Sequence, residues 1–204
     1  GDPAQFERYR AFDTLDRATS LECISNINIA SNSTVAMLEE LLLWGNALED
    51  ESGFRTREHD CRQLVETVVK RLELISKGKG ISVSIDVDPA LNIEADPEIL
   101  KTVLRNLLGN ALKFTPRDGR IHVVARRESD AIMFMVSDSG PGIDDSVRDS
   151  IWNSVERKSM PGTEQEIGTG VGLAICKVLV ERHGGTISFE SRKGEGTDFI
   201  FRIP

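Results

Sequence analysis

Helical periodicity dominates the N-terminal part of the chain. Apolar residues from Val35 to Leu48 recur at helical spacing, with acidic and amide side chains between them. An apolar stripe also runs upstream from Phe6 to Ile27, and a polar cluster at 31–34 interrupts it. A long helix with such a stripe needs a partner helix, and nothing else in the chain offers one. We therefore expect residues 1–55 to be a helical segment through which two copies associate as a homodimer.

From about residue 56 the pattern becomes a mixture of helices and strands. Strict alternation over 81–87 predicts a half-buried strand, and further strands are expected over 121–127, 132–136, 186–191 and 197–203, the last two as a hairpin. Helices are expected over 64–75, 97–114, 144–152 and 170–182, and the second of them has Asp96 as N-cap and Pro97 at its first position. Residues 156–169 lack periodicity and predict a mobile loop. The fold class is therefore α+β, a two-layer sandwich of one mixed sheet with helices on one face, preceded by the long helical segment.

Composition narrows the range of partners. The net charge of −8 on 204 residues disfavours nucleic acid, because phosphate backbones favour an excess of Lys and Arg. No apolar run reaches membrane-spanning length, so we expect a cytoplasmic domain without direct membrane contact, either on its own or as the cytoplasmic part of a membrane-anchored receptor. The three cysteines, Cys23, Cys61 and Cys176, have no paired spacing and predict buried thiols in a reducing compartment.

Three polar side chains share one face of the helix expected over 97–114. At about 100° per residue, Asn106, Asn110 and Lys113 fall within a sector of about 60°, and the neighbouring face is apolar. Amide oxygens suit Mg²⁺, and a lysine supplies a point charge to a phosphate. Taken alone, this spacing is also compatible with a polar helix face that has no function.

A second motif, Asp138-Ser-Gly140-Pro-Gly142, follows the strand expected over 132–136. Its carboxylate therefore stands at a strand end, where it can accept a hydrogen bond from the exocyclic amine of adenine. The two glycines let the backbone turn and approach a planar base closely. An isolated motif of this kind fits a glycine-rich turn with an aspartate cap equally well.

A third motif, Gly168-Thr-Gly170-Val-Gly172-Leu173, opens the last expected helix. Helix N-termini present unpaired N–H groups and the positive end of the helix dipole to phosphates. The motif is not a Rossmann fingerprint, because no strand directly precedes it, and no Gly-Lys-Ser/Thr marks a Walker loop. The alternative for this motif alone is a flexible hinge.

In this order the three motifs resemble the GHKL, or Bergerat, ATP-binding fold, and most closely the catalytic ATP-binding domain of sensor histidine kinases. The resemblance covers about residues 60–204, and we place the domain at 56–204. The asparagine helix is similar to the N box of the family, and the two glycine motifs are similar to its G1 and G2 boxes. The run from Glu181 to Pro204 also resembles the family.

The resemblance implies ATP and Mg²⁺ as ligands. In the family's pattern Asp138 reads the adenine amine, Thr197 helps to hold the base, Asn110 holds Mg²⁺ with Asn106 beside it, and Lys113 meets phosphate. Asn106, Asn110 and Lys113 are accordingly the expected catalytic residues. The expected nucleotide-binding set is completed by Phe114, Gly140, Gly142, Ile143, Gly168, Thr169, Gly170, Val171, Gly172 and Leu173.

The resemblance also favours a kinase over an ATPase. GHKL ATPases place a glutamate four residues before the metal-binding asparagine to activate water, but Asn106 occupies this position and cannot take up a proton. The implied reaction is transfer of the γ-phosphoryl group to a protein histidine. The implied partner is the receiver domain of a response regulator in a two-component system.

One part of the chain departs from the family pattern. Ile151-Trp152-Asn-Ser-Val155 stands in place of the phenylalanine-rich F box, with Trp152 and Val155 where phenylalanine is usual. A catalytically inactive, nucleotide-binding docking module of the same fold is therefore the alternative function. A stand-alone serine kinase uses this fold too, but the long N-terminal helix argues against it.

None of the three histidines has the context of a phosphoacceptor. His183 stands in a His-Gly-Gly helix end, His122 lies in an expected strand, and His59 lies in a segment that resembles the family's entry into the ATP domain. Residues 20–53 resemble the second helix of a dimerisation and phosphotransfer hairpin, whose acceptor is on the first helix. The acceptor motif either precedes residue 1 or is missing from the parent protein, so we expect no autophosphorylation of this chain.

Overall fold

The computed structural model describes residues 19–20, 23–24, 55–148, 150–152, 162–164 and 170–204. The chain divides into two compact units, residues 1–42 and 43–204. The four described residues of the first unit are helical. The rest of the expected dimerisation segment lies outside the described residues, so its helical extent, its boundary at residue 55 and its pairing with a second copy stay predictions.

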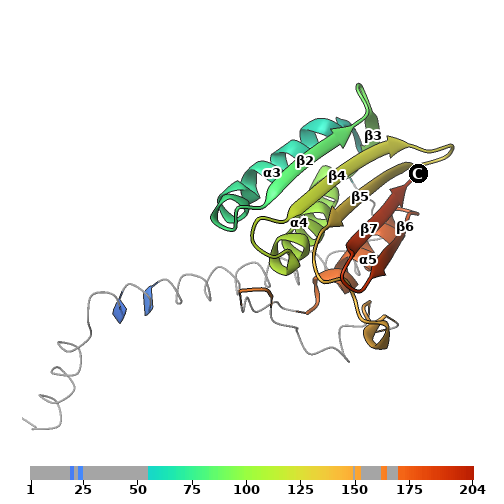
Figure 1. Ribbon diagram of the computed structural model, residues 1–204. Coiled ribbons are helices and arrows are strands. Elements are labelled where there is room, and N and C mark those ends of the chain that lie inside the picture. Colours follow the sequence, from blue (N-terminus) through green and yellow to red (C-terminus); the bar gives the residue numbers. More distant parts are fainter. Residues whose placement is uncertain (1–18, 21–22, 25–54, 149, 153–161, 165–169) are drawn as a thin grey trace, which may run out of the picture. The chain divides into compact units, whose positions relative to one another are not determined.

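The second unit is a mixed sheet with helices on one face. Its elements are β1 (Arg57–Asp60), α3 (Cys61–Gly78), β2 (Ser82–Val87), β3 (Asn92–Ala95), α4 (Pro97–Phe114), β4 (Arg120–Arg127), β5 (Ile132–Asp138), the 3-10 turn η1 (Asp145–Val147), α5 (Gly172–Arg182), β6 (Thr186–Arg192) and β7 (Gly196–Ile203). Five strands run in the order β2-β4-β5-β7-β6; β2 and β4 are parallel and the other neighbours are antiparallel. Helices α3, α4 and α5 cover one face of this sheet (Figure 1), which confirms the predicted two-layer sandwich.

Helix α4 connects the two parallel strands and has the bounds that the sequence predicts. A parallel pair needs a long crossover connection, and α4 lies between β2 and β4 in the chain. Asp96 caps the helix by accepting hydrogen bonds from the N–H groups of Glu98 and Ile99, at 3.0 and 3.5 Å, and Pro97 occupies the first turn, where no N–H partner is needed. The helix is therefore fixed at its start by local chemistry.

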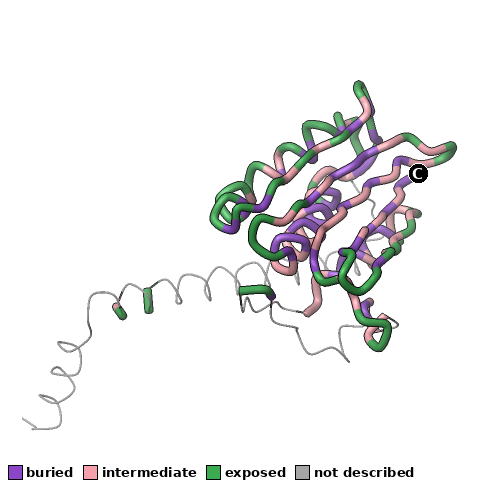
Figure 2. Tube along the Cα trace, in the orientation of Figure 1, coloured by how far each residue is buried: buried purple, intermediate pink, exposed green. Residues whose placement is uncertain are grey.

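The hydrophobic core lies between the sheet and the helices. Leu104 and Leu107 of α4 are fully buried, as are Phe134 of β5 and Phe201 of β7, whose rings stack with centroids 4.8 Å apart. Figure 2 shows buried residues along the strands and on α4. The alternation of buried and less buried residues along β5 and β7 is the period of two that a half-buried sheet requires.

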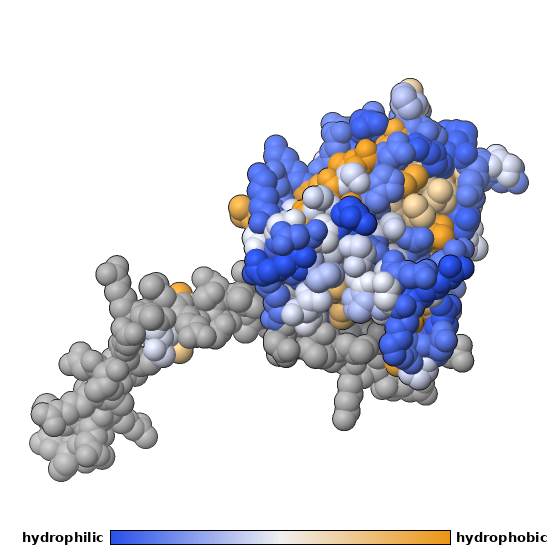
Figure 3. Space-filling view, viewed as in Figure 1, coloured by the Kyte–Doolittle hydropathy of each residue, from blue (hydrophilic) through white to orange (hydrophobic). Residues whose placement is uncertain are grey.

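The sheet face that points away from the helices also carries apolar side chains. Val124, Met135 and Ile200 are cross-strand neighbours on β4, β5 and β7, and they alternate with core residues, so they lie on the outer face. Hydrophobic residues are visible between polar ones on the molecular surface in Figure 3. No helix in the described part of the chain is long and apolar enough to cross a membrane.

Several predictions on local structure were wrong. The helix expected over 144–152 is only the 3-10 turn η1, because successive hydrogen bonds there join residues three apart. Helix α5 begins at Gly172 and not at Gly170. Strands β1 and β3, which form a two-stranded sheet, were not predicted. Cys23 is exposed, whereas Cys61 and Cys176 are buried as expected.

Candidate nucleotide-binding site

A cavity of about 620 Å³ opens between α4, the end of β5, the start of β7 and the start of α5. Most of the predicted site residues line it: Asn106, Asn110, Lys113, Phe114, Asp138, Gly142, Ile143, Gly170, Gly172, Leu173 and Thr197. Gly140 and Val171 are described but do not line the cavity, and Gly168 and Thr169 lie outside the described residues. Three separate motifs are thus brought together at one place.

The polar stripe of α4 forms one wall. Asn106, Asn110 and Lys113 all face the cavity, and the Lys113 Nζ lies 4.8 Å from the centroid of the Phe114 ring. The Asn106 Nδ2 is buried and has no hydrogen-bond partner among the described residues. A buried amide donor without a partner is costly, which suits a site whose ligand supplies an acceptor.

Asp138 ends strand β5 and points into the same space. Its Oδ1 accepts a hydrogen bond from the Gly140 N–H at 2.8 Å. Burial raises the pKa of this carboxyl to about 6, the N–H groups of Gly140 and Thr197 lower it, and the charge of Asp198 raises it. The carboxyl is therefore desolvated yet keeps acceptor capacity for a further donor.

The glycines of the second motif are required by close contacts. A Cβ at Gly140 would lie 2.7 Å from Asp138 Oδ1 and 2.9 Å from the Phe114 carbonyl oxygen. Gly142 has a φ of +72°, and a Cβ there would lie 2.2 Å from the Arg192 carbonyl oxygen. Both positions therefore need a glycine for the turn to pass between α4 and the β6–β7 hairpin.

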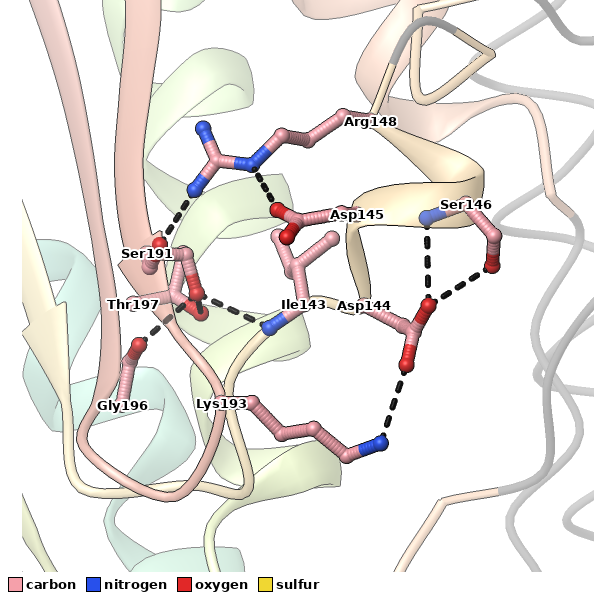
Figure 4. Close-up of polar contacts among 9 residues, drawn as sticks. All are labelled: Ile143, Asp144, Asp145, Ser146, Arg148, Ser191, Lys193, Gly196 and Thr197. Atoms are coloured by element: carbon pink, nitrogen blue, oxygen red, sulfur yellow. Dashed lines mark hydrogen bonds and ion pairs between the residues drawn. The ribbon is translucent and has the colours of Figure 1, made fainter.

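Ser191 connects two predicted site residues and was missed in the sequence. It is buried, and its Oγ accepts a hydrogen bond from the Ile143 N–H at 2.9 Å (Figure 4). The same oxygen lies 2.9 Å from the Thr197 Oγ1 and donates to the Gly196 carbonyl oxygen at 2.8 Å. A serine on the buried face of β6, in line with Ile187 and Phe189, was the available signal.

The segment after Gly142 is tied to the hairpin by ionic contacts. Lys193 Nζ lies 3.0 Å from Asp144 Oδ2, and the Asp144 side chain also accepts hydrogen bonds from Ser146, which hold the pKa of Asp144 well below its usual range. Arg148 donates to the Ser191 carbonyl oxygen and to Asp145 (Figure 4). These contacts anchor the edge of the cavity nearest Ile143.

The start of α5 brings backbone N–H groups to the cavity. Its N-cap residue, Val171, makes no side-chain capping bond, and Gly170, Gly172 and Leu173 line the cavity. A Cβ at Gly172 would lie 3.2 Å from the Asn106 Oδ1, so this helix end approaches α4 closely. Backbone N–H groups without a side-chain cap among the described residues, together with the positive helix end, make a suitable phosphate site opposite the α4 stripe.

The donor set fits ATP and a magnesium ion held largely by phosphate. No group of three or more His, Cys, Asp or Glu side chains that could hold a metal occurs in the described part of the chain. Asn110 offers one amide oxygen, and Mg²⁺ commonly combines few protein ligands with phosphate oxygens and water. The unpartnered Asn106 amide and the open α5 terminus fit the phosphates in the same way.

None of the three histidines, all of which the structure describes, lines this cavity. His183 caps the end of α5: its Nδ1 lies 3.1 Å from the Leu179 carbonyl oxygen and its Nε2 accepts from the Asp96 N–H at 3.3 Å. Burial lowers the pKa of His183. These contacts give His183 a structural role at the end of α5.

Known proteins resemble this chain over most of its length. The family model described as histidine kinase-, DNA gyrase B-, and HSP90-like ATPase matches residues 95–204. The adaptive-response sensory kinase SasA of Synechococcus sp. is 31% identical over 193 residues, 94% of this chain and 51% of that protein. The sensor histidine kinase TmoS of Ectopseudomonas mendocina is 35% identical over 156 residues, 76% of this chain and 16% of that protein.

Solved structures agree with these relatives. The catalytic domain of the histidine kinase ThkA superposes with a TM-score of 0.66 at 29% identity, over 74% of this chain and 96% of that chain. Full-length ShkA in complex with AMPPNP gives a TM-score of 0.73 at 27% identity, over 86% of this chain and 36% of that chain. The chain belongs to the family of histidine kinase-, DNA gyrase B- and HSP90-like ATPases. Within it, residues 95–204 are a catalytic domain of the sensor histidine kinase type. The chain spans about half, or less, of the length of the two relatives.

Proposed function

We propose that this chain binds ATP with Mg²⁺ and transfers the γ-phosphoryl group to a histidine outside its own three. The observation that supports this most is the meeting of Asp138, the α4 stripe and the uncapped start of α5 in one cavity. In the reaction the bond between the γ-phosphorus and the β–γ bridging oxygen breaks, a nitrogen–phosphorus bond forms, and ADP leaves.

Each wall has a separate task. Asp138 accepts a hydrogen bond from the adenine amine, and Thr197, held by Ser191, supports the base. Asn110 would hold Mg²⁺ through its amide oxygen, and the bound ion would neutralise phosphate charge. Lys113 and the α5 N–H groups bind phosphate oxygens. The protein thus mainly positions the triphosphate and stabilises its charge.

The carboxylates of the cavity favour transfer over hydrolysis. Among the described lining residues only Asp138 and Asp144 are acidic. Asp138 is assigned to the base, and Asp144 is bound by Lys193 and Ser146. With Asn106 at the position where the family's ATPases have a glutamate, none of these groups is placed as a general base for water beside Asn110.

The partners follow from the same family. The histidine kinase ThkA has been solved in complex with the response regulator protein TrrA, at 25% identity and a TM-score of 0.69 to this chain. We propose a response regulator receiver domain as the downstream partner and a homodimer through residues 1–55 as the assembly. The acceptor histidine is then presented by a helical hairpin of the dimer or of another polypeptide.

The inactive docking module is the second candidate, and the F-box region bears on it. Trp152 packs between Phe189 and Phe199 with centroid distances of 6.0 and 6.3 Å, and Ile151 is buried. The partly buried tryptophan therefore packs against the core through aromatic contacts, as a phenylalanine could. Val155, the other departure from the F-box pattern, lies outside the described residues.

Calorimetry on this chain tests the proposal. Wild type should bind ATP, more tightly with Mg²⁺ present; Asp138→Asn should lose affinity with or without Mg²⁺, whereas Asn110→Asp should mainly change the dependence on Mg²⁺. Unchanged affinity in both variants would show that the site is assigned wrongly. Labelled ATP and a separate hairpin protein with an acceptor histidine then separate the candidates: acid-labile label on the hairpin supports the kinase, and binding without transfer supports the docking module.

A further inference from the structure

We propose that Lys79 and Thr163 are positioning residues that hold the phosphate-binding end of α4. This deepens the proposed function and rests on it. Lys79 follows α3 and is only 4% exposed, which is rare for an ammonium group. Thr163 lies in the described segment 162–164, between the F-box region and α5. Neither residue belongs to a nucleotide-binding motif.

The two side chains occupy the carbonyl groups at the end of α4. Lys79 Nζ donates to the Leu112 carbonyl oxygen at 2.8 Å and to the Thr163 Oγ1 at 2.7 Å. The Thr163 N–H donates to the Lys113 carbonyl oxygen at 3.0 Å, and the Thr163 hydroxyl lies 3.2 Å from the carbonyl oxygens of both Lys113 and Thr115. The last four carbonyl groups of a helix lack partners within it, so these contacts fix the final turn from outside. A cation at this end is also favoured by the helix dipole.

The turn that is fixed in this way is part of the nucleotide site. It carries Lys113 and Phe114, and Gly162 and Thr163 line the same cavity. An ion pair of 2.7 Å between Arg117, just after α4, and Glu164 is a second contact between the end of α4 and segment 162–164. The lysine assigned to phosphate therefore receives its backbone position from a contact outside the motifs, and loss of that contact lets the last turn fray.

Matched variants of the full chain test this by calorimetry with ATP and with adenosine. Thr163→Val removes the hydroxyl and keeps the shape, and Lys79→Met keeps the buried stem without its charge. We expect each to weaken ATP binding about fivefold, the effect of one net hydrogen bond, and to change adenosine binding less than about twofold. Thr163→Ser keeps the hydroxyl and should bind as wild type. Lys77→Met, which removes a 70% exposed lysine two residues before Lys79, is the charge control.

Measurements in the Lys113→Ala variant distinguish positioning of Lys113 from a general effect on stability. In Lys113→Ala the phosphate contact is gone, so adding Thr163→Val should cause no further loss of ATP affinity. Equal losses for ATP and adenosine, or an undiminished effect of Thr163→Val in Lys113→Ala, would overturn the proposal. If Lys79→Met fails to fold, the comparison of Thr163→Val with Thr163→Ser, at an exposed position, is sufficient for the test. Absence of ATP binding by wild type would refute the proposed function itself, whereas wild-type binding with an unaffected Thr163→Val refutes only this inference.

Discussion

Asp138 has to be both buried and charged, and these two requirements conflict. Burial raises its pKa to about 6, above the ordinary value of 3.8 that applies when the chain is unfolded. Between these two pKa values the folded state binds more protons than the unfolded state. The contribution of this carboxyl to the free energy of unfolding is therefore greatest at low pH and falls as the pH rises through this window.

Replacement of this carboxyl should stabilise the fold at neutral pH. We expect Asp138→Asn to raise the free energy of unfolding by roughly 1–2 kcal/mol at about pH 7.5. This is less than the free energy that corresponds to the whole rise in pKa, because solvent still reaches the site. Urea unfolding should show the difference shrinking toward zero near pH ~4, where the wild-type carboxyl is protonated in the folded state.

The same substitution, which stabilises the fold, should weaken nucleotide binding at neutral pH. The ratio of wild-type to Asp138→Asn affinity for ATP should fall as the pH is lowered from about 7.5 to about 5, because protonation removes the charged acceptor. Using the ratio cancels the titration of the phosphates. A stability difference that is independent of pH would contradict the burial-based account of this residue.

Side chains that we propose to contact the nucleotide were easier to predict than those that support them. Asp138, Asn106 and Asn110 were predicted because the chemistry of the nucleotide restricts both their type and their spacing. Ser191 and Lys79 act through contacts between segments that are distant in sequence, at Ile143 and Leu112 respectively. No local pattern encodes such a contact, so it becomes visible only in the folded chain.

At the scale of elements, β7 begins in close contact with the end of β5, the strand that carries Asp138. Gly196 has a φ of +105°, and a Cβ there would lie 1.9 Å from the Asp138 carbonyl oxygen. Gly194, in the turn just before β7, has a φ of +84°, but a Cβ there would have no neighbouring atom within 4 Å. The two glycines thus share a left-handed backbone and differ in the space around them.

This pair separates backbone strain from steric contact. Gly194→Ala should cost about 1 kcal/mol of unfolding free energy, from its φ alone, while Gly196→Ala should cost about 3 kcal/mol or more. Gly196→Ala should also weaken ATP binding because β5 and β7 must separate beside Asp138, and Gly194→Ala should not. Urea unfolding and calorimetry measure both effects. Equal costs for the two substitutions would show that the contact with β5 relaxes freely.

The elements differed in how well the sequence predicted them. Helix α4 was predicted at both ends because its apolar period is long and because Asp96 and Pro97 mark its start. Strands β1 and β3 contain four residues each, too few for an alternation to stand out. The stretch after Asp144 looks helical in sequence, but Asp144, Ser146 and Arg148 use their side chains for capping and for the β6–β7 hairpin, which favours separate turns.

At the scale of the whole molecule, the cavity exists only because the sheet order brings distant segments together. Strands β5 and β7 are neighbours, so Asp138 lies opposite Thr197, while α4 and the start of α5 approach each other over the same end of the sheet. Sequence reasoning predicted the members of this set through the family's motifs. The close approach of Gly172 to Asn106, which completes the enclosure, depends on packing between helices.

The assembled site predicts what the isolated chain does with ATP. Asp138 and Asp144 are the acidic residues of its described lining. The first is assigned to the adenine base and the second is bound by Lys193 and Ser146, and no histidine lines the cavity. We therefore expect this chain alone, with ATP and Mg²⁺, to release ADP no faster than Asp138→Asn does, and to acquire no acid-labile phosphate. Addition of a hairpin protein with an acceptor histidine should raise ADP release in step with label on that protein. ADP release by the chain alone, clearly above that of the variant, would mean that water is activated by a base outside this set and that the site hydrolyses ATP.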